Sequence, residues 1–165
     1  MTLTQGRVKE LLLYNSEHGT FVWKGSRKGV PNKKGLNAGY VHSTKNHFIC
    51  IAGVKYRAHR LAWLYMTGKW PKNEIDHVNL NRLDNRWKNL REATHSQNNA
   101  NTAKRANHSG RFKGAYFHKL TGKWRSQIKK DGRLYYLGLF DAEEQAHIAY
   151  SKKAQELFGE FARAA

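Results

Sequence analysis

The run of residues 100–111, ANTAKRANHSGR, constrains most strongly how this chain can fold. It is polar and basic and poor in large apolar side chains, so it adds little to any hydrophobic core. It separates a first part of mixed pattern from a tail in which apolar and polar residues alternate. For 165 residues with a 39% apolar share, we therefore expect two or three small cores around a linker.

The net charge is the next constraint. Thirty Lys and Arg against twelve Asp and Glu give a formal charge of +18, which favours a polyanionic partner, above all nucleic acid. There is no long apolar run, lipidation motif or signal-peptide core, so we expect no membrane association. The single Cys50 excludes an internal disulfide. We expect it to be a small buried side chain in a reducing, cytoplasmic setting.

The part before the linker predicts short elements. Residues 3–14 predict a helix with Thr4 as its N-cap, and residues 56–67 predict a second helix that Gly68 ends. Between them, short β-prone pieces predict a meander of strands at residues 20–23, 40–42 and 48–51. A basic, Gly-rich loop at residues 24–35 is able to hold phosphates or to be a solvated connection.

The tail predicts three strands and one helix. The strands are expected at residues 115–119, 123–130 and 134–139, with an Asp131-Gly132 turn between the last two. Asp141 is expected to cap the helix, with Glu144 completing a capping box. In the middle strand Trp124, Ser126 and Ile128 alternate with the polar residues, so one face of the sheet packs on the helix and the other is basic.

The stretch of residues 74–101 contains the residues suited to catalysis. Asp76 and His77 follow an apolar residue, an Asn-rich loop and Asn89 come next, and Asn98 lies on a short predicted helix. Asp76 is a hard anionic ligand for one divalent cation, Mg²⁺ or Mn²⁺, and Asn98 offers a neutral oxygen. A neutral His77 can accept a proton from an attacking water. This combination suits metal-assisted hydrolysis of a phosphodiester.

This stretch resembles the HNH endonucleases of phage and mobile-element type, in their H-N-N form. The residues that match are IDHVNLNRLDNRWKNL and THSQNN, with AHRLAWLYMTGKWP upstream. The resemblance implies two strands and a helix around one metal ion, held by Asp76 and Asn98, with His77 as general base. It assigns support of the His77 ring to the region of Asn89.

Structural alternatives stay open for each of these residues. Asp76 is alternatively a turn cap and His77 a structural histidine, while Asn89 would then only tie the loop together. Asn99 is the rival of Asn98. His59 is expected to be structural or to support the site, and His95 to bind phosphate, cap the helix or be exposed. Five arginines are expected to grip backbone phosphates or to be plain surface charge: Arg57, Arg60, Arg82, Arg86 and Arg91.

The tail resembles the AP2 (ERF-type) DNA-binding domain over residues 113–162. The matching features are Gly114, the Gly-Lys-Trp at residues 122–124, YLGLF at residues 136–140 and a helix with Ala149 and Tyr150. The resemblance implies that the basic sheet face enters the major groove. The alternative is a solvated sheet face. The residues expected to contact DNA are Lys113, Tyr116, His118, Arg125, Gln127, Lys129, Arg133 and Tyr136.

The sequence thus predicts an α+β chain in four segments. These are an N-terminal helix and strand meander (1–55), a ββα-metal nuclease core (56–102), a basic linker (103–112) and an AP2-like sheet and helix (113–165). The expected function is a metal-dependent, site-specific homing or nicking endonuclease on duplex DNA, with no obligate protein partner, in a bacterial host cell. The alternatives are an inactive DNA-binding regulator and a structure-specific nuclease.

Overall fold

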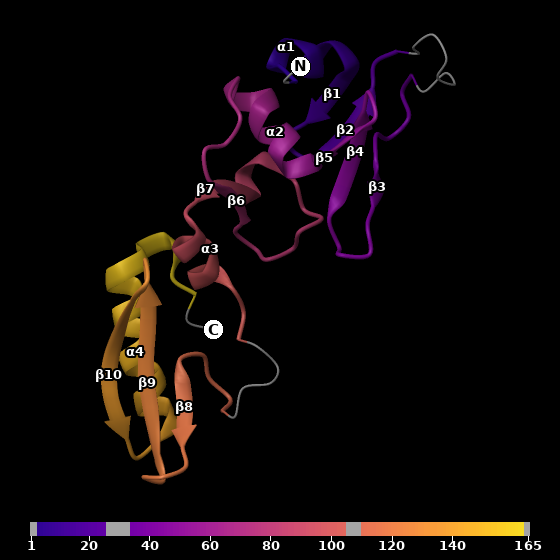
Figure 1. Cartoon of the computed structure of the whole chain (residues 1–165). Coiled ribbons are helices and arrows are strands. Elements are labelled where there is room, and N and C mark those ends of the chain that lie inside the picture. The colour runs from indigo at the N-terminus through magenta and orange to yellow at the C-terminus, as the bar shows by residue number, and fades with distance from the viewer. Residues whose placement is uncertain (1–2, 26–33, 105–109, 164–165) are drawn as a thin grey trace. The chain divides into compact units, whose positions relative to one another are not determined.

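The computed structural model describes residues 3–25, 34–104 and 110–163 (Figure 1). The chain divides into two compact units, Met1–Glu92 and Ala93–Ala165. Each unit has its own hydrophobic cluster, as expected for a chain with small cores. The predicted boundaries after residues 55 and 102 do not coincide with this division. Parts of two predicted segments, residues 26–33 of the basic loop and 105–109 of the linker, lie outside the described residues.

The first unit begins with a helix and a hairpin. Helix α1 (Gln5–Leu11) is capped by Thr4, whose hydroxyl accepts a hydrogen bond from the Arg7 amide at 3.3 Å. The predicted helix to residue 14 is too long, because β1 (Leu12–Asn15) starts directly after it and pairs with β2 (Thr20–Trp23). Leu12 and Tyr14 point into the core and the residues after each point out, which is the period of a strand.

A three-stranded antiparallel sheet and a helix complete this core. The strands are β3 (Tyr40–Val41), β4 (His47–Ile51) and β5 (Val54–Arg57), and α2 (Ala58–Thr67) follows directly. The helix starts two residues later than predicted because Tyr56 and Arg57 still pair with β4. It ends at Gly68, whose φ of 81° is the left-handed conformation expected there. Cys50 is exposed, contrary to the prediction, because its neighbours in β4 face the core.

Residues 74–101 contain a strand pair and a helix. Strand β6 (Glu74–His77) pairs with β7 (Leu90–Ala93), and η1 (Trp87–Asn89) precedes β7. Helix α3 (His95–Asn101) starts with a capping box formed by Thr94 and Gln97. The division between the units falls within β7, so α3 belongs to the second unit.

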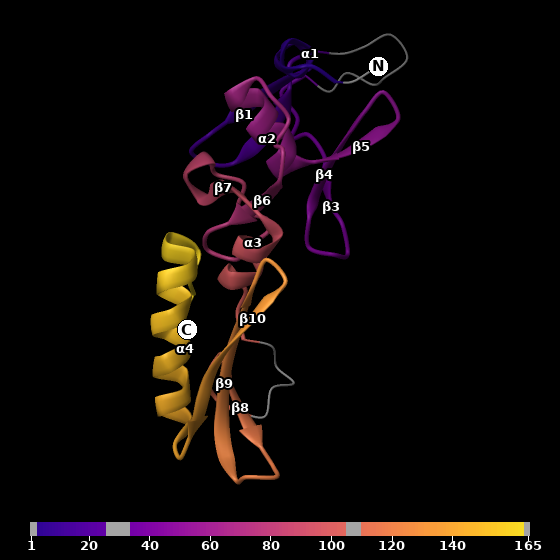
Figure 2. The same ribbon diagram turned by 60° about the vertical axis from the view of Figure 1, so that its left-hand side comes forward.

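The second unit is a sheet covered on one face by a helix. Strands β8 (Ala115–His118), β9 (Lys123–Lys130) and β10 (Arg133–Phe140) are antiparallel in the order β10-β9-β8. The Asp131-Gly132 turn has positive φ at both residues, 48° and 84°, as a two-residue hairpin turn requires. Helix α4 (Glu143–Phe158) runs along one face of the sheet (Figure 2), and η2 (Gly159–Phe161) follows it.

The start of α4 differs from the prediction. Ala142 is the N-cap and makes no side-chain cap bond, while the Asp141 carboxylate pairs with Lys123 at 3.0 Å. Glu144 likewise pairs with Arg111 at 2.8 Å instead of completing a capping box. The buried Glu143 accepts a hydrogen bond from the Phe112 amide at 2.7 Å. Among the described residues, no helix is long and apolar enough to cross a membrane.

Candidate active site

Asp76 and His77 lie at the end of β6 and are both buried, with exposures of 3% and 6%. The Asp76 carboxylate faces Arg91 of β7, and its Oδ2 lies 2.9 Å from the Arg91 Nε. The two side chains are 4% and 16% exposed, so water screens this ion pair weakly. Asp76 is therefore a buried carboxylate that is already paired with a cationic side chain.

Asn85 and His59 are two of the neighbours that hold the His77 ring. The Nε2 of His77 lies 3.1 Å from the side-chain oxygen Oδ1 of Asn85. The His59 ring packs edge-on against the His77 ring, with ring centroids 5.0 Å apart and an angle of 90° between the ring planes. Burial lowers the pKa of His77, although the Asn85 hydrogen bond and the Asp76 carboxylate oppose that effect. Burial and the neighbouring His77 lower the pKa of His59 to about 3. Both imidazoles are thus neutral near pH 7, and a neutral His77 can accept a proton.

Asn89 fastens the loop between β6 and β7. Its Oδ1 accepts from the Asn79 amide at 3.0 Å and its Nδ2 donates to the Asp84 carbonyl at 2.7 Å. Asn85 of the same loop contacts the His77 ring. Asn89 thus ties the loop together, and its predicted support of the His77 ring stays a prediction. The sequence contained no signal to separate Asn85 from the other asparagines of an Asx-rich loop.

An ion pair stiffens the same loop. Arg86 donates from Nε to Asp84 Oδ1 at 2.7 Å, and Asn79 donates to Asp84 Oδ2 at 2.6 Å. These hydrogen bonds, that of Arg86 above all, lower the pKa of Asp84 to about 2. The charged loop side chains thus bind one another and fix the backbone next to His77.

Three of the five arginines expected to grip phosphates are bonded to protein groups. Arg86 binds Asp84, Arg91 binds Asp76, and Arg60 donates to the carbonyls of Asn73 at 3.2 Å and Pro71 at 3.4 Å. Arg57 and Arg82 are exposed. Arg60, Arg86 and Arg91 therefore have structural contacts, and phosphate binding by any of the five arginines stays a prediction.

Asn98 and His95 both lie on α3 in the second unit. Asn98 is half-buried and its amide donates to the Thr94 carbonyl at 2.9 Å, while His95 is exposed at the first helical position. Their predicted contacts with metal and phosphate stay predictions. No cluster of three or more His, Cys, Asp or Glu side chains suited to a metal occurs among the described residues. A carboxylate with a neutral amide still fits Mg²⁺, which usually keeps several waters.

The second unit presents a polar sheet face opposite α4. Ser126 and Ile128 are 0% and 5% exposed, so the alternate residues of β9 point to the other side. Tyr116 is in register with Arg125, and Tyr136 with Gln127, which puts all four on one face. Of the residues predicted to contact DNA, this outer face contains Tyr116, His118, Arg125, Gln127, Lys129 and Tyr136.

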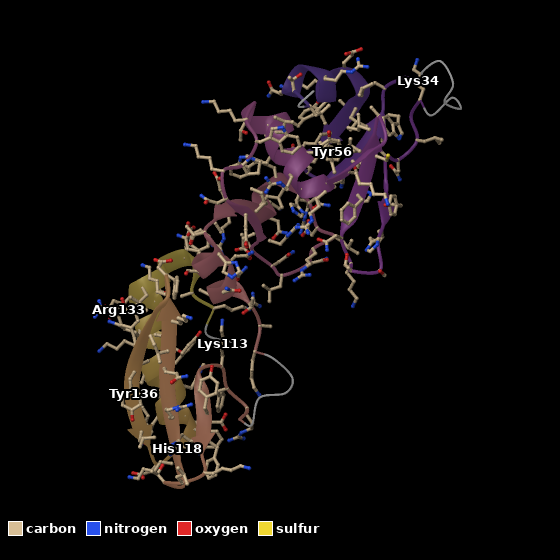
Figure 3. The ribbon with its side chains drawn as sticks, viewed as in Figure 1. Lys34, Tyr56, Lys113, His118, Arg133 and Tyr136 are labelled. Carbon is tan, nitrogen blue, oxygen red and sulfur yellow. The ribbon has the colours of Figure 1, made fainter. Side chains whose placement is uncertain are left out.

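Two residues predicted to contact DNA do not belong to the outer face (Figure 3). The Lys113 ammonium donates to the carbonyls of Ala100, Thr102 and Arg163 at 2.6, 2.8 and 3.2 Å, so it is used inside the unit. Arg133 is in register with Lys130, whose ammonium binds the Leu157 carbonyl of α4, and it lies over the Tyr135 ring at 5.1 Å. Arg133 therefore lies on the helix side of the sheet.

Comparisons with known proteins agree with the resemblance of the catalytic stretch. Residues 56–100 match the family model described as HNH endonuclease. Over 110 residues the chain is 34% identical to a protein of Acanthamoeba polyphaga mimivirus described as an uncharacterized HNH endonuclease. That match covers 66% of this chain and 56% of the viral protein, so the chain spans about half the length of this relative. The matched region contains α2, the β6–β7 pair and most of α3.

Proposed function

We propose that this chain is a metal-dependent endonuclease of HNH type that hydrolyses phosphodiester bonds in DNA, with His77 as its general base. One observation supports this most directly. The buried His77, bonded through its ring to Asn85, immediately follows the buried carboxylate of Asp76 at the end of β6. Both residues lie inside the region that matches the HNH endonuclease family.

In the proposed mechanism His77 accepts the proton of the water that attacks phosphorus. Asp76 would hold the divalent cation, Mg²⁺ or Mn²⁺, and Asn98 is proposed as its second protein ligand. When bound, the cation would neutralise phosphate charge and stabilise the leaving oxygen. Arg91 keeps the Asp76 carboxylate oriented through its Nε contact at 2.9 Å. His59 limits rotation of the His77 ring by packing against it edge-on.

Duplex DNA is the proposed substrate. The chain has a formal charge of +18, and the outer face of the second unit offers Arg125 and Lys129 beside the exposed Tyr136. We propose that this face binds DNA in the manner implied by the AP2-like pattern, with Arg57 and Arg82 contacting backbone phosphates. A single catalytic motif in the chain favours cutting one strand per event, as in a homing or nicking enzyme.

Nicking of supercoiled plasmid tests the proposal. Wild-type protein with Mg²⁺ or Mn²⁺ should convert supercoiled DNA to the open circle, and a chelator should stop the reaction. His77→Ala should lose nicking and still retard duplex DNA in a gel. The matched control is His42→Ala, which removes an exposed imidazole in the same unit and should nick normally. If wild type binds duplex DNA but never nicks with either cation, the proposal is wrong.

One observation favours a second candidate, a DNA-binding regulator without catalysis. The Arg91 guanidinium lies against the Asp76 carboxylate, where a catalytic cation would have to bind. The chelator-sensitive nicking assay separates the two candidates. Parallel assays on branched DNA and on RNA would distinguish a structure-specific nuclease from one that acts on plain duplex.

A further inference from the structure

We propose that Asn85, fixed in place by the β1–β2 hairpin, is the positioning residue that sets the tautomer and direction of the His77 ring. This inference deepens the proposed function and rests on His77 being its general base. It assigns a role in catalysis to chain segments before residue 56, which lie outside the region matched to the family.

The carboxamide of Asn85 can face the ring in only one sensible orientation. Its Nδ2 donates to the Leu83 carbonyl at 3.4 Å, which leaves Oδ1 toward His77 Nε2 at 3.1 Å. A carboxamide oxygen only accepts, so the neutral ring must donate from Nε2–H. The lone pair is then on Nδ1. Asn85 thus selects the ring nitrogen that can take a proton.

Three contacts join the hairpin to the chain segment of residues 85–87. The buried Tyr14 hydroxyl donates to the Asn85 carbonyl at 2.6 Å, and the Trp87 amide donates to the Ser16 carbonyl at 2.9 Å. The turn at Gly19 also approaches very closely. A Cβ there would lie 2.4 Å from the Asn85 carbonyl carbon and 2.3 Å from the Arg86 nitrogen. Only glycine allows this approach, and its φ of 70° suits glycine.

The burial of this arrangement makes it rigid. Asn85 is 1% exposed and Tyr14 is 7% exposed, so water does not replace either bond. The Tyr14 ring also stacks on Phe21 of β2, with the two ring centroids 4.7 Å apart. This contact fixes the direction of the Tyr14 hydroxyl. Loss of Asn85 or of the Tyr14 hydroxyl should therefore misplace the base more than it weakens DNA binding.

The first experiment is nitrogen NMR of the full-length protein with labelled histidine, at a pH where His77 is neutral. The ¹⁵N shifts of the His77 ring distinguish a protonated nitrogen from a bare one. We expect the Nε2–H tautomer in wild type and in Asn85→Asp, which keeps an acceptor oxygen, and a mixture of tautomers in Asn85→Ala. A dominant Nδ1–H tautomer in wild type would overturn the inference. This readout needs no nuclease activity, so it tests the orientation even if the proposed function fails.

The second experiment measures nicking kinetics. Asn85→Ala should lower kcat by about 100-fold with little change in KM, because a misplaced base affects the chemical step. Asn85→Asp should recover part of that loss. The matched control is Asn46→Ala, which removes another buried amide of the first unit, bonded to Thr44. An equal fall in kcat for the control, or no fall for Asn85→Ala, would refute a positioning role.

Tyr14→Phe tests the hairpin with a smaller change. It removes only the hydroxyl, and Tyr65→Phe is the matched control because Tyr65 packs against Tyr14 at 5.7 Å in the same cluster. Tyr14→Phe should lower kcat and Tyr65→Phe should not. In the Asn85→Ala background Tyr14→Phe should cause no further loss of kcat, because its effect passes through that side chain. Additive losses would mean that Tyr14 acts on stability alone.

Discussion

Replacing Arg91 by Met tests how strongly the site depends on a positive charge beside Asp76. The substitution keeps much of the side-chain volume and removes the guanidinium that lies 2.9 Å from the Asp76 carboxylate. Removing one partner of a buried ion pair costs about 3–5 kcal/mol, since the remaining charge is poorly solvated. Arg91 is 16% exposed in its side chain, which favours the lower end of that range.

The expected loss is large for the first unit, which has 92 residues. In a domain of this size each kcal/mol moves the melting temperature by about 4–8 °C, so a loss of ~3 kcal/mol means about 12–24 °C. Mg²⁺ should stabilise Arg91→Met more than wild type, because the cation can then face Asp76 without displacing Arg91. At ten times its dissociation constant, a ligand of the folded state contributes about 1.4 kcal/mol.

Thermal unfolding followed by tryptophan fluorescence, with and without Mg²⁺, measures both effects. The double variant Asp76→Asn with Arg91→Met removes both charges and should regain most of the lost stability. It should also lose the extra stabilisation by Mg²⁺. The reasoning is refuted if Arg91→Met unfolds within about 1 kcal/mol of wild type, or if Mg²⁺ stabilises all three proteins equally.

Three further predictions concern the two units separately. Gly114→Ala should destabilise the second unit by about 2 kcal/mol or more in chemical denaturation, because φ is +82° and the new Cβ would lie 2.0 Å from Tyr150 Cγ. Gly122→Ala, with positive φ but open space, should cost clearly less. Lys113→Met should lower the stability of the second unit and leave the salt dependence of DNA binding unchanged, because its ammonium binds three carbonyls. A shallower salt dependence in Lys113→Met would mean that Lys113 does contact a phosphate. Asp84, with its pKa lowered to about 2 in the folded chain, should contribute stability that is complete above its ordinary pKa of 3.8 and is lost as pH falls through about 2. Asp84→Asn should remove that part of the acid dependence, and an unchanged acid melting curve would contradict the assignment.

Sequence patterns predicted the elements of the second unit well because their signals are local. The alternation along β9 and the Asp131-Gly132 turn depend on near neighbours, and the structure has both. The cap at Asp141 was wrong because its carboxylate is taken by Lys123, which is distant in sequence. The N-cap propensity of a residue depends on its local sequence, so it cannot account for an ion pair with a distant residue.

The contacts of individual side chains in residues 74–101 were harder to predict than the strands and helix of that stretch. Asp76 and His77 lie at the end of β6, next to each other in the stretch that the sequence singled out. The sequence could not tell that Asn85 faces the ring while Asn89 binds the loop backbone, since both are asparagines of one loop. Lys113 and Arg133 were expected on the DNA-binding face, but their positions depend on carbonyls and rings contributed by distant segments.

Helix α3 is attached to the C-terminal sheet and helix by bonds at both of its ends. Near its start the Ser96 hydroxyl accepts from the Asp131 amide at 2.9 Å, and near its end the Ala100 carbonyl accepts from the Lys113 ammonium at 2.6 Å and the Arg163 amide at 3.4 Å. Asn98 lies between these attachments. Asn98 should therefore move together with the hairpin of β9 and β10. A polymer bound to the sheet would then also set the position of this amide.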